Sequence, residues 1–185
     1  MANVDQAFGL RAIGKVGQNR DNQGLSEYQI AANSTAIYQG DPVILDDTGY
    51  IEVAAATNVN LIGVLNGIFY TDATTNKPTW ANHLAAANTA TDIQGFVADD
   101  PYERFEVQSA GTVARTNIGN CADIVYAAGS TPNYVSGVEA SGTMAAGTAQ
   151  LKIIGLAKTQ DNAFGANAVV VVTINEHILK QTAGI

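Results

Sequence analysis

The sequence predicts an all-β protein, a β-sandwich or a small β-barrel, with an extended N-terminal arm. Three observations predict this fold class. Charged residues make up only 14% of the chain, against about 25% in a typical soluble protein. Eighteen glycines and many Thr, Asn and Ser residues take their place, a composition suited to short strands and many turns. Roughly ten short apolar runs alternate with turn residues about every dozen positions.

The first 26 residues are predicted to form the arm, and residues 27–185 a β-rich domain. Apolar side chains in this arm are separated by glycines, and a polar, glycine-flanked stretch follows at residues 17–24. Two interpretations stay open. The arm orders on a partner through apolar anchors and basic residues that complement an acidic neighbour, or it is the first strand of the domain's own sheet. The candidate partner-binding residues are Phe8, Leu10, Arg11, Ile13 and Lys15.

The first half of the domain contains the clearest local signal, a hairpin. Residues 43–45 and 50–53 are β-formers that flank a turn ending in Gly49. Residues 61–70 follow as an apolar strand, and the glycines within it predict bulges or bends. After a polar loop at residues 72–76, residues 77–80 are expected to return as a short strand.

The next segments are less regular. The Ala-rich residues 82–91 are compatible with a helical turn. Residues 93–98 and 104–108 predict a second strand–turn–strand unit around Pro101, which cannot donate to a sheet and so belongs in the turn. In the second half we expect short strands at residues 123–127 and 135–139, and longer ones at 150–158 and 168–174. The valines of the last run do not alternate with polar residues, which predicts a central strand buried on both faces.

The charge balance bears on partners. The formal net charge is −8, and a diffuse negative surface repels phosphate groups, so neither nucleic acid nor an anionic membrane is an expected partner. No apolar run approaches the roughly 18 residues that cross a bilayer. The first residues lack the basic and apolar regions of a signal peptide, and the lone Cys121 permits no intrachain disulfide. We therefore expect synthesis and folding in a cytoplasm.

The chain offers few groups for catalysis. Its only histidines are His83, expected to be exposed, and His177, expected at a strand end or interface. Cys121 has no His within ten positions and is expected to be a small packed residue. No Ser lies in a nucleophile-elbow motif. We predict no catalytic residues and no small-molecule substrate.

Metal and cofactor sites are not predicted either. The acid pairs at residues 46–47 and 99–100 lack the spacing of a calcium loop, and Asp is a common turn residue. The nearest approach to a phosphate loop, residues 14–17, has no helix pattern behind it. A carbohydrate-binding surface normally shows several exposed aromatics, whereas this chain has a single Trp80. Stacked aromatics with converging carboxylates would favour that function, and a flat apolar patch near the arm would favour protein binding.

Several stretches resemble the capsid decoration (cement) proteins of tailed bacteriophages. The resemblance begins with residues 1–14, MANVDQAFGLRAIG, and covers about the first two thirds of the chain. After residue 111 only the general style is similar. The other matching stretches are residues 28–31 (YQIA), 40–43 (GDPV), 61–64 (LIGV), 67–70 (GIFY), 97–101 (VADDP) and 105–108 (FEVQ).

The resemblance implies a structural virion protein on the outer surface of the capsid. Such a protein would be made in the host bacterial cytoplasm, bind the major capsid protein, bridge its subunits and stabilise the head. It would be a homo-oligomer, with a trimer favoured over a dimer, and it would carry no cofactor. Two alternatives stay open: another phage structural component, such as a tail or fibre-base subunit, and a carbohydrate-binding module or small hydrolase.

Overall fold

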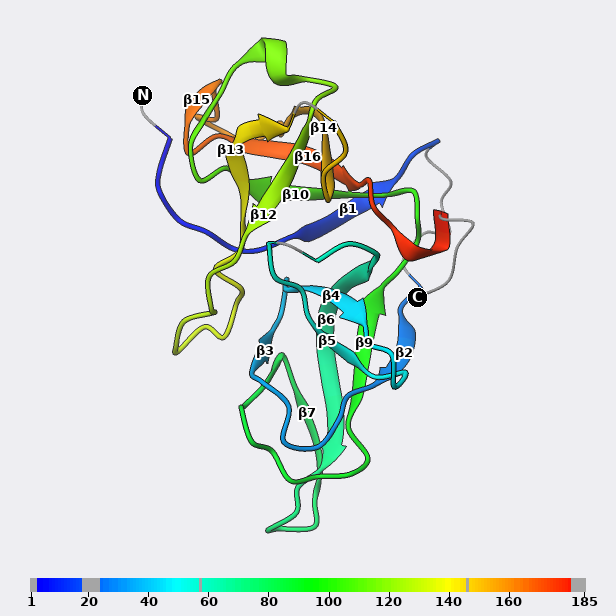
Figure 1. Cartoon of the computed structure of the whole chain (residues 1–185). Coiled ribbons are helices and arrows are strands. Elements are labelled where there is room, and N and C mark those ends of the chain that lie inside the picture. The colour runs from blue at the N-terminus through cyan, green and yellow to red at the C-terminus, as the bar shows by residue number, and fades with distance from the viewer. Residues whose placement is uncertain (1–2, 18–23, 57, 146, 181–185) are drawn as a thin grey trace.

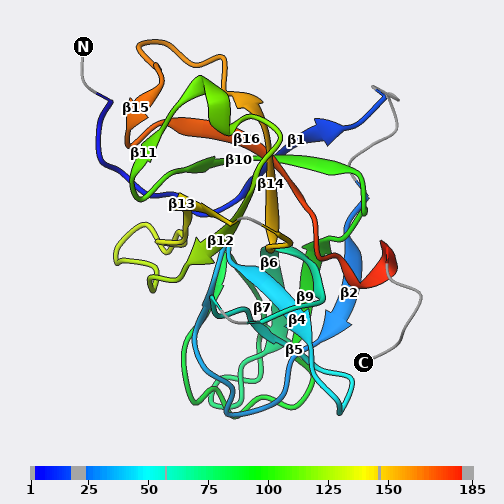
Figure 2. The same ribbon diagram turned by 45° about the horizontal axis from the view of Figure 1, so that its top comes forward.

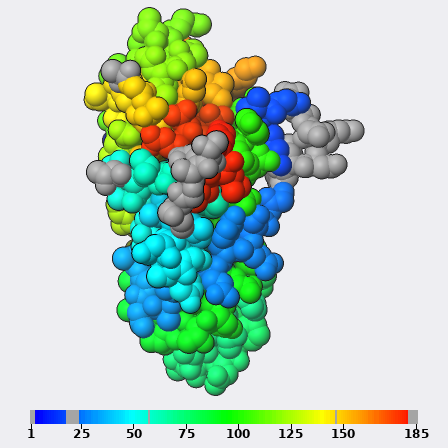
Figure 3. Space-filling model, turned by 45° about the vertical axis from the view of Figure 1, so that its right-hand side comes forward, coloured from blue at the N-terminus to red at the C-terminus, as the bar shows by residue number. Residues whose placement is uncertain are grey.

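The chain forms two β lobes joined end to end, seen in a computed structural model that describes residues 3–17, 24–56, 58–145 and 147–180. Figure 1 shows the upper lobe, which contains β1 and β10 to β16, above the lower lobe, which contains β2 to β9. The chain therefore starts in the upper lobe, builds the lower lobe and then returns. The surface view in Figure 3 shows the same elongated shape, with segments from both lobes meeting at the middle.

The upper lobe is built on a six-stranded antiparallel sheet with the order β1-β10-β16-β14-β12-β13. Alternate residues face its core, as the strand period of two requires. Phe105 on β10 and Val172 on β16 are partners across the sheet, and both are fully buried. The strands are β1 Arg11–Lys15, β10 Glu103–Gln108, β16 Val169–Ile174, β14 Leu151–Leu156, β12 Cys121–Val125 and β13 Glu139–Ala145.

The lower lobe is built on a second antiparallel sheet with the order β2-β9-β6-β4-β5, and β7 pairs with β6 beyond this path. The long strand β6 is its centre, because it pairs with β9, β4 and β7. The strands are β2 Ser26–Gln29, β9 Gln94–Ala98, β6 Leu61–Thr71, β4 Pro42–Leu45, β5 Ile51–Val53 and β7 Pro78–Ala81.

Short elements complete the chain. Two-stranded ladders join β3 (Ile37–Tyr38) to β8 (His83–Leu84), and β11 (Thr112–Val113) to β15 (Gly165–Ala166). The helical segments are single 3-10 turns, η1 (Arg115–Asn117) and η2 (Ile178–Lys180). In the part of the chain that the structure describes, no helix is long and apolar enough to cross a membrane.

The core of the upper lobe continues into the lower lobe. Ile44, Leu61 and Val64 belong to lower-lobe strands, yet their side chains pack in the same cluster as Phe105. Leu61 also donates its N–H to the Glu176 carbonyl oxygen, 2.9 Å away. Other buried apolar residues of the lower lobe form a separate cluster, which includes Ile37, Leu65 and Ile68. The two lobes are therefore joined by apolar packing as well as by the chain.

The all-β prediction is confirmed, and the sheets form no closed barrel. The hairpin expected at residues 43–53 is formed by β4 and β5, with Leu45 opposite Ile51. β6 has a register shift between Leu65 and Gly67, as its glycines predicted. The return strand after residue 77 is β7.

Three local predictions were wrong, and one that was correct has an unexpected pairing. Residues 82–91 form β8 and turns and no helical turn, because the stretch packs Leu84 into the core beside Ile37. The strand–turn–strand unit predicted around Pro101 is confirmed as β9, a turn and β10; the two strands pair in different sheets, so the turn carries the chain from one lobe to the other. The strand expected at 135–139 starts only at Glu139. β16 is central but buried on one face, since its even-numbered residues are covered and its odd-numbered ones half-exposed.

The structure decides between the two interpretations of the N-terminal residues. Residues 11–15 form β1, an edge strand of the protein's own sheet, paired antiparallel with β10 (Figures 1 and 2). Residues 3–6 lie along the same lobe without strand pairing. The Asn3 side chain bonds the backbone of Ala163 and Ala166, and the Gln108 side chain bonds the backbone of Val4 and Gln6.

Candidate partner-binding surface

The five predicted partner-binding residues have different surroundings. Leu10 is only 2% exposed and packs in the upper-lobe core, so its side chain supports this protein's own fold. Ile13 is 41% exposed on β1. Phe8 is half-buried, and the Arg11 guanidinium lies over its ring at 5.2 Å. Within the described residues β1 pairs only with β10, so the other edge of this strand is open.

The two basic residues of this group are paired within the chain. Arg11 forms an ion pair with Glu106, its register partner on β10. Lys15 Nζ lies 2.7 Å from Asp100 Oδ2, and the hydrogen bond and charge of Asp100 raise the pKa of Lys15. Both pairs are partly exposed, and such pairs contribute little to stability. Because nearby carboxylates already neutralise both positive charges, this surface would bind a partner mainly through apolar contacts.

A groove of about 410 Å³ lies at the junction of the lobes, beside the start of β1. We call it the junction groove. Three of the five predicted residues line it, namely Phe8, Leu10 and Arg11, whereas Ile13 and Lys15 do not. Its other described lining residues are Ala12, Gly24, Leu25, Gln39, Gly40, Val64, Leu65, Asn66, Ala98, Asp100, Glu103 and Val135.

A second, flatter surface adjoins the groove on the lower lobe. Trp80 on β7 is 68% exposed, and its ring stacks on Phe96 of β9 with 4.8 Å between centroids. Phe69 on β6 packs against the same ring at 5.2 Å. Beside these rings is a shallow hollow of about 450 Å³. We call this surface the Trp80 patch; its described lining residues are Leu25, Asn66, Gly67, Trp80, Ala81, Asn82 and Phe96.

The junction groove and the Trp80 patch form one continuous surface, because Leu25 and Asn66 line both. Sequence reasoning missed the patch, since Trp80, Phe96 and Phe69 are far apart in the sequence and meet only through the pairing of β7, β6 and β9. A partial signal was available. Trp80 and Phe69 are direct partners across the β6–β7 hairpin, and a hairpin register fixes such pairs.

The histidines and the cysteine do not assemble into a catalytic group. His83 is half-buried, contrary to its predicted exposure, because its ring stacks between two tyrosines. The distance between ring centroids is 3.8 Å to Tyr134 and 6.1 Å to Tyr38. His177 is fully buried just after β16, and its Nδ1 accepts the Leu179 N–H at 3.1 Å. Cys121 is half-buried on β12, opposite Lys152 of β14.

Three of the four acids in the two acid pairs have partners within this chain. The Asp46 carboxylate accepts the N–H groups of Thr48 and Tyr50, and the Thr48 hydroxyl is the main cause of its lowered pKa. Asp99 accepts the Tyr28 hydroxyl at 2.7 Å, and Asp100 pairs with Lys15. Within the described residues, no group of three or more His, Cys, Asp or Glu side chains could hold a metal ion.

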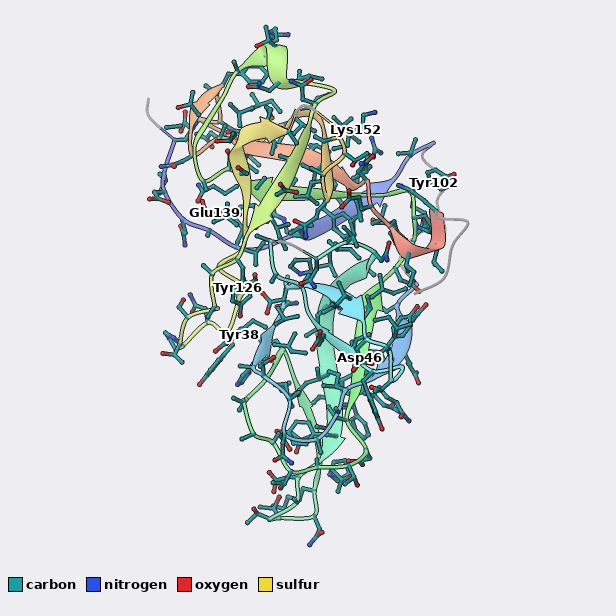
Figure 4. All side chains as sticks on the ribbon, in the orientation of Figure 1. Tyr38, Asp46, Tyr102, Tyr126, Glu139 and Lys152 are labelled. Carbon is teal, nitrogen blue, oxygen red and sulfur yellow. The ribbon has the colours of Figure 1, made fainter. Side chains whose placement is uncertain are left out.

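Two buried ionisable groups lie at the junction of the lobes. Asp41 is fully buried; its Oδ2 accepts the Tyr38 N–H at 2.8 Å, and its Oδ1 has no described partner. Burial raises its pKa to about 6, and the neighbouring Ser136 hydroxyl and the Tyr38 N–H partly oppose this rise by favouring the charged form. Tyr126 lies near Tyr38 (Figure 4), and burial, followed by the Asp41 charge, raises the pKa of Tyr126. Burial also lowers the pKa of His177 to about 4, and its Nε2 has no described partner.

Among the described residues, neither carboxylates nor nucleophiles converge on the junction groove or the Trp80 patch in a catalytic arrangement. The two acids in the groove are already used, since Glu103 Oε1 accepts the Gly14 N–H at 3.0 Å and Asp100 pairs with Lys15. The surface offers apolar contact and an open strand edge. Comparison with protein-family models, with curated proteins and with solved structures found no match to this chain.

Proposed function

We propose that this chain is a structural virion protein of the capsid-decoration type, which binds the outside of a phage head through the β1 side of its upper lobe. The observation that carries the proposal is the open edge of β1 beside the junction groove, whose lining combines apolar side chains with a few polar and charged ones. An unpaired strand edge is a template for contact with another chain, and exposed apolar surface next to it marks a protein-binding site.

The resemblance of the N-terminal residues to decoration proteins names the partner, the major capsid protein. The geometry supports this in a modified form. Leu10 anchors the segment to the protein's own core, while Ile13 and Phe8 remain partly accessible beside the groove. A protein held to the shell in this way would bridge subunits and stabilise the assembled head by mass action.

The test is co-sedimentation of the purified chain with heads assembled from its major capsid protein. Ile13→Asp should weaken binding on the order of 30-fold or more, because it would bury a carboxylate in an apolar contact. Ile154→Asp is a matched control, since Ile154 is 40% exposed on β14 of the same sheet. Saturable binding by the native chain and the control, but not by Ile13→Asp, supports the proposal. Equal binding by both variants, or none by the native chain, refutes it.

Carbohydrate binding is the second candidate, and the exposed Trp80 ring favours it. An indole face stacks on sugar rings, and the amides of Asn66 and Asn82 in the same patch could bond hydroxyl groups. The converging carboxylates that would strengthen this candidate are missing among the described residues of the patch. A glycan screen of the native chain and Trp80→Ala tests it directly.

A further inference from the structure

The Trp80 patch combines a projection and a recess in one place. Trp80 projects from β7 with 68% of its surface exposed, although its ring already packs on Phe96 and Phe69. The shallow hollow lies directly beside it, and Trp80 forms part of the hollow's wall. An exposed tryptophan on a flat sheet face is the residue type that most often dominates the energy of a protein interface.

A two-fold axis suits this arrangement. In an isologous contact the same patch is used by both copies, so a projection next to a recess can fill the partner's recess while its own is filled in return. A partner of different shape would need a separate recess for Trp80 and a separate projection for the hollow. The local shape therefore favours a second copy of the same chain.

The charge distribution agrees with a second copy. The chain carries a formal net charge of −8, so two copies repel each other over most of their surfaces. None of the described residues that line the Trp80 patch is charged. A neutral, partly aromatic area is where two such molecules can meet with the least electrostatic cost, and salt should tighten the contact by screening the remaining repulsion.

We infer that the Trp80 patch is a self-association surface, through which two copies of this chain form a symmetric dimer with Trp80 of each copy in the hollow of the other. The inference is independent of the proposed capsid role, because it requires no other protein. It also differs from the trimer that the resemblance implies.

The experiment uses the full chain in a concentration series, at about 50 and about 500 mM NaCl. Sedimentation gives the oligomeric state. Because Trp80 is the only tryptophan, its fluorescence reports the environment of the patch without a label. We expect a monomer–dimer equilibrium that tightens several-fold with salt, accompanied by a shift of the emission to shorter wavelength as the indole leaves water.

Trp80→Ala should weaken dimerisation on the order of 30-fold or more. Tyr102→Ala is the matched control, since Tyr102 is 62% exposed, lies beside η2 (Figure 4) and does not line the Trp80 patch. Asn66→Asp provides a second variant, which adds a carboxylate to the patch of each copy while the side chain can still accept the Gln39 hydrogen bond. It should also favour the monomer.

Three results would overturn the inference. The first is a chain that remains monomeric at the highest concentration. The second is association that leaves the Trp80 emission unchanged and is equally strong in the native chain and in Trp80→Ala. A trimer that depends on Trp80 would contradict the two-fold geometry. A glycan that shifts the emission of a monomeric chain would assign the patch to that ligand. Capsid binding, tested separately with Ile13→Asp, can fail or succeed without affecting any of these outcomes.

Discussion

Replacing Asp41 with Asn should stabilise the protein at neutral pH. The carboxyl group is fully buried at the junction of the lobes, and one of its oxygens has no described hydrogen-bond partner. Asparagine has nearly the same shape, its amide oxygen can accept the Tyr38 N–H that Asp41 accepts now, and its amide NH2 would face the Ser136 hydroxyl, which can accept a hydrogen bond. The substitution therefore removes a charge that the fold has to desolvate while keeping the packing and the bond.

The magnitude follows from the raised pKa. The pKa of Asp41 rises from 3.8 to about 6 on folding, and a shift of roughly two units corresponds to about 3 kcal/mol. Because the folded state binds the proton more tightly, the penalty is absent below the unfolded pKa and complete above the folded one. Asp41→Asn should thus raise the free energy of unfolding by up to about 3 kcal/mol at neutral pH, and by almost nothing below about pH 4.

His177 has the opposite pH dependence. Burial lowers the pKa of His177 from 6.5 to about 4 on folding, so the folded state favours the neutral ring. This contribution to the free energy of unfolding is complete above about pH 6.5 and is lost as the pH falls towards 4. This loss is again about 3 kcal/mol. Across the same range Asp41 becomes protonated and regains a similar amount. The two effects roughly cancel in the native chain, whereas Asp41→Asn exposes the loss from His177.

Denaturant unfolding at about pH 7 and about pH 4.5 measures the difference between the native chain and the variant at each pH. Other carboxylates titrate equally in both proteins, so they drop out of this difference. Asp47→Asn, at an exposed turn position, should change stability by less than about 0.5 kcal/mol at either pH. If Asp41→Asn gives a difference that does not vary with pH, Asp41 is not a desolvated acid and the reasoning is wrong.

Two further substitutions test the packing. Leu10→Ala should cost about 3 kcal/mol of unfolding free energy by denaturant titration, because Leu10 is buried in the upper-lobe core, whereas Val4→Ala, at a 74% exposed position, should cost less than about 0.5 kcal/mol. Gly63→Ala should cost on the order of 2 kcal/mol in thermal unfolding, since the new Cβ would lie 2.3 Å from the Ala98 carbonyl oxygen. Gly155→Ala has no atom within 4 Å of the new Cβ and should unfold like the native chain. Equal effects within either pair would contradict the burial described here.

The parts of the fold that the sequence predicted are those governed by local chemistry. The hairpin of β4 and β5 follows from β-formers around a turn, and Asp46 supports that turn with its own hydrogen bonds. The pairing of distant segments could not be predicted in the same way. Nothing near Pro101 indicates that the strands before and after it belong to different sheets, because that choice depends on which core each strand can join.

The candidate surface shows the same division. The N-terminal residues were selected from their apolar spacing, and part of them does line the junction groove. Leu10 and Ile13 could not be distinguished, because the burial of Leu10 depends on strands more than thirty residues away, whose side chains share its core cluster. The Trp80 patch depends wholly on sheet topology. The β6–β7 hairpin brings Phe69 and Trp80 together locally, but Phe96 joins them only through the pairing of β9 with β6, which the sequence did not predict.

The position of β1 decides how the binding function has to be tested. If the N-terminal segment were only an arm, deleting residues 1–16 would remove binding and leave the fold intact. In this structure the same deletion would remove an edge strand, the core residue Leu10 and the hydrogen bonds made by Asn3. A loss of capsid binding after that deletion would therefore be equally explained by unfolding. The single exposed side chain of Ile13 separates the two effects, because it lies on β1 and supports neither core cluster.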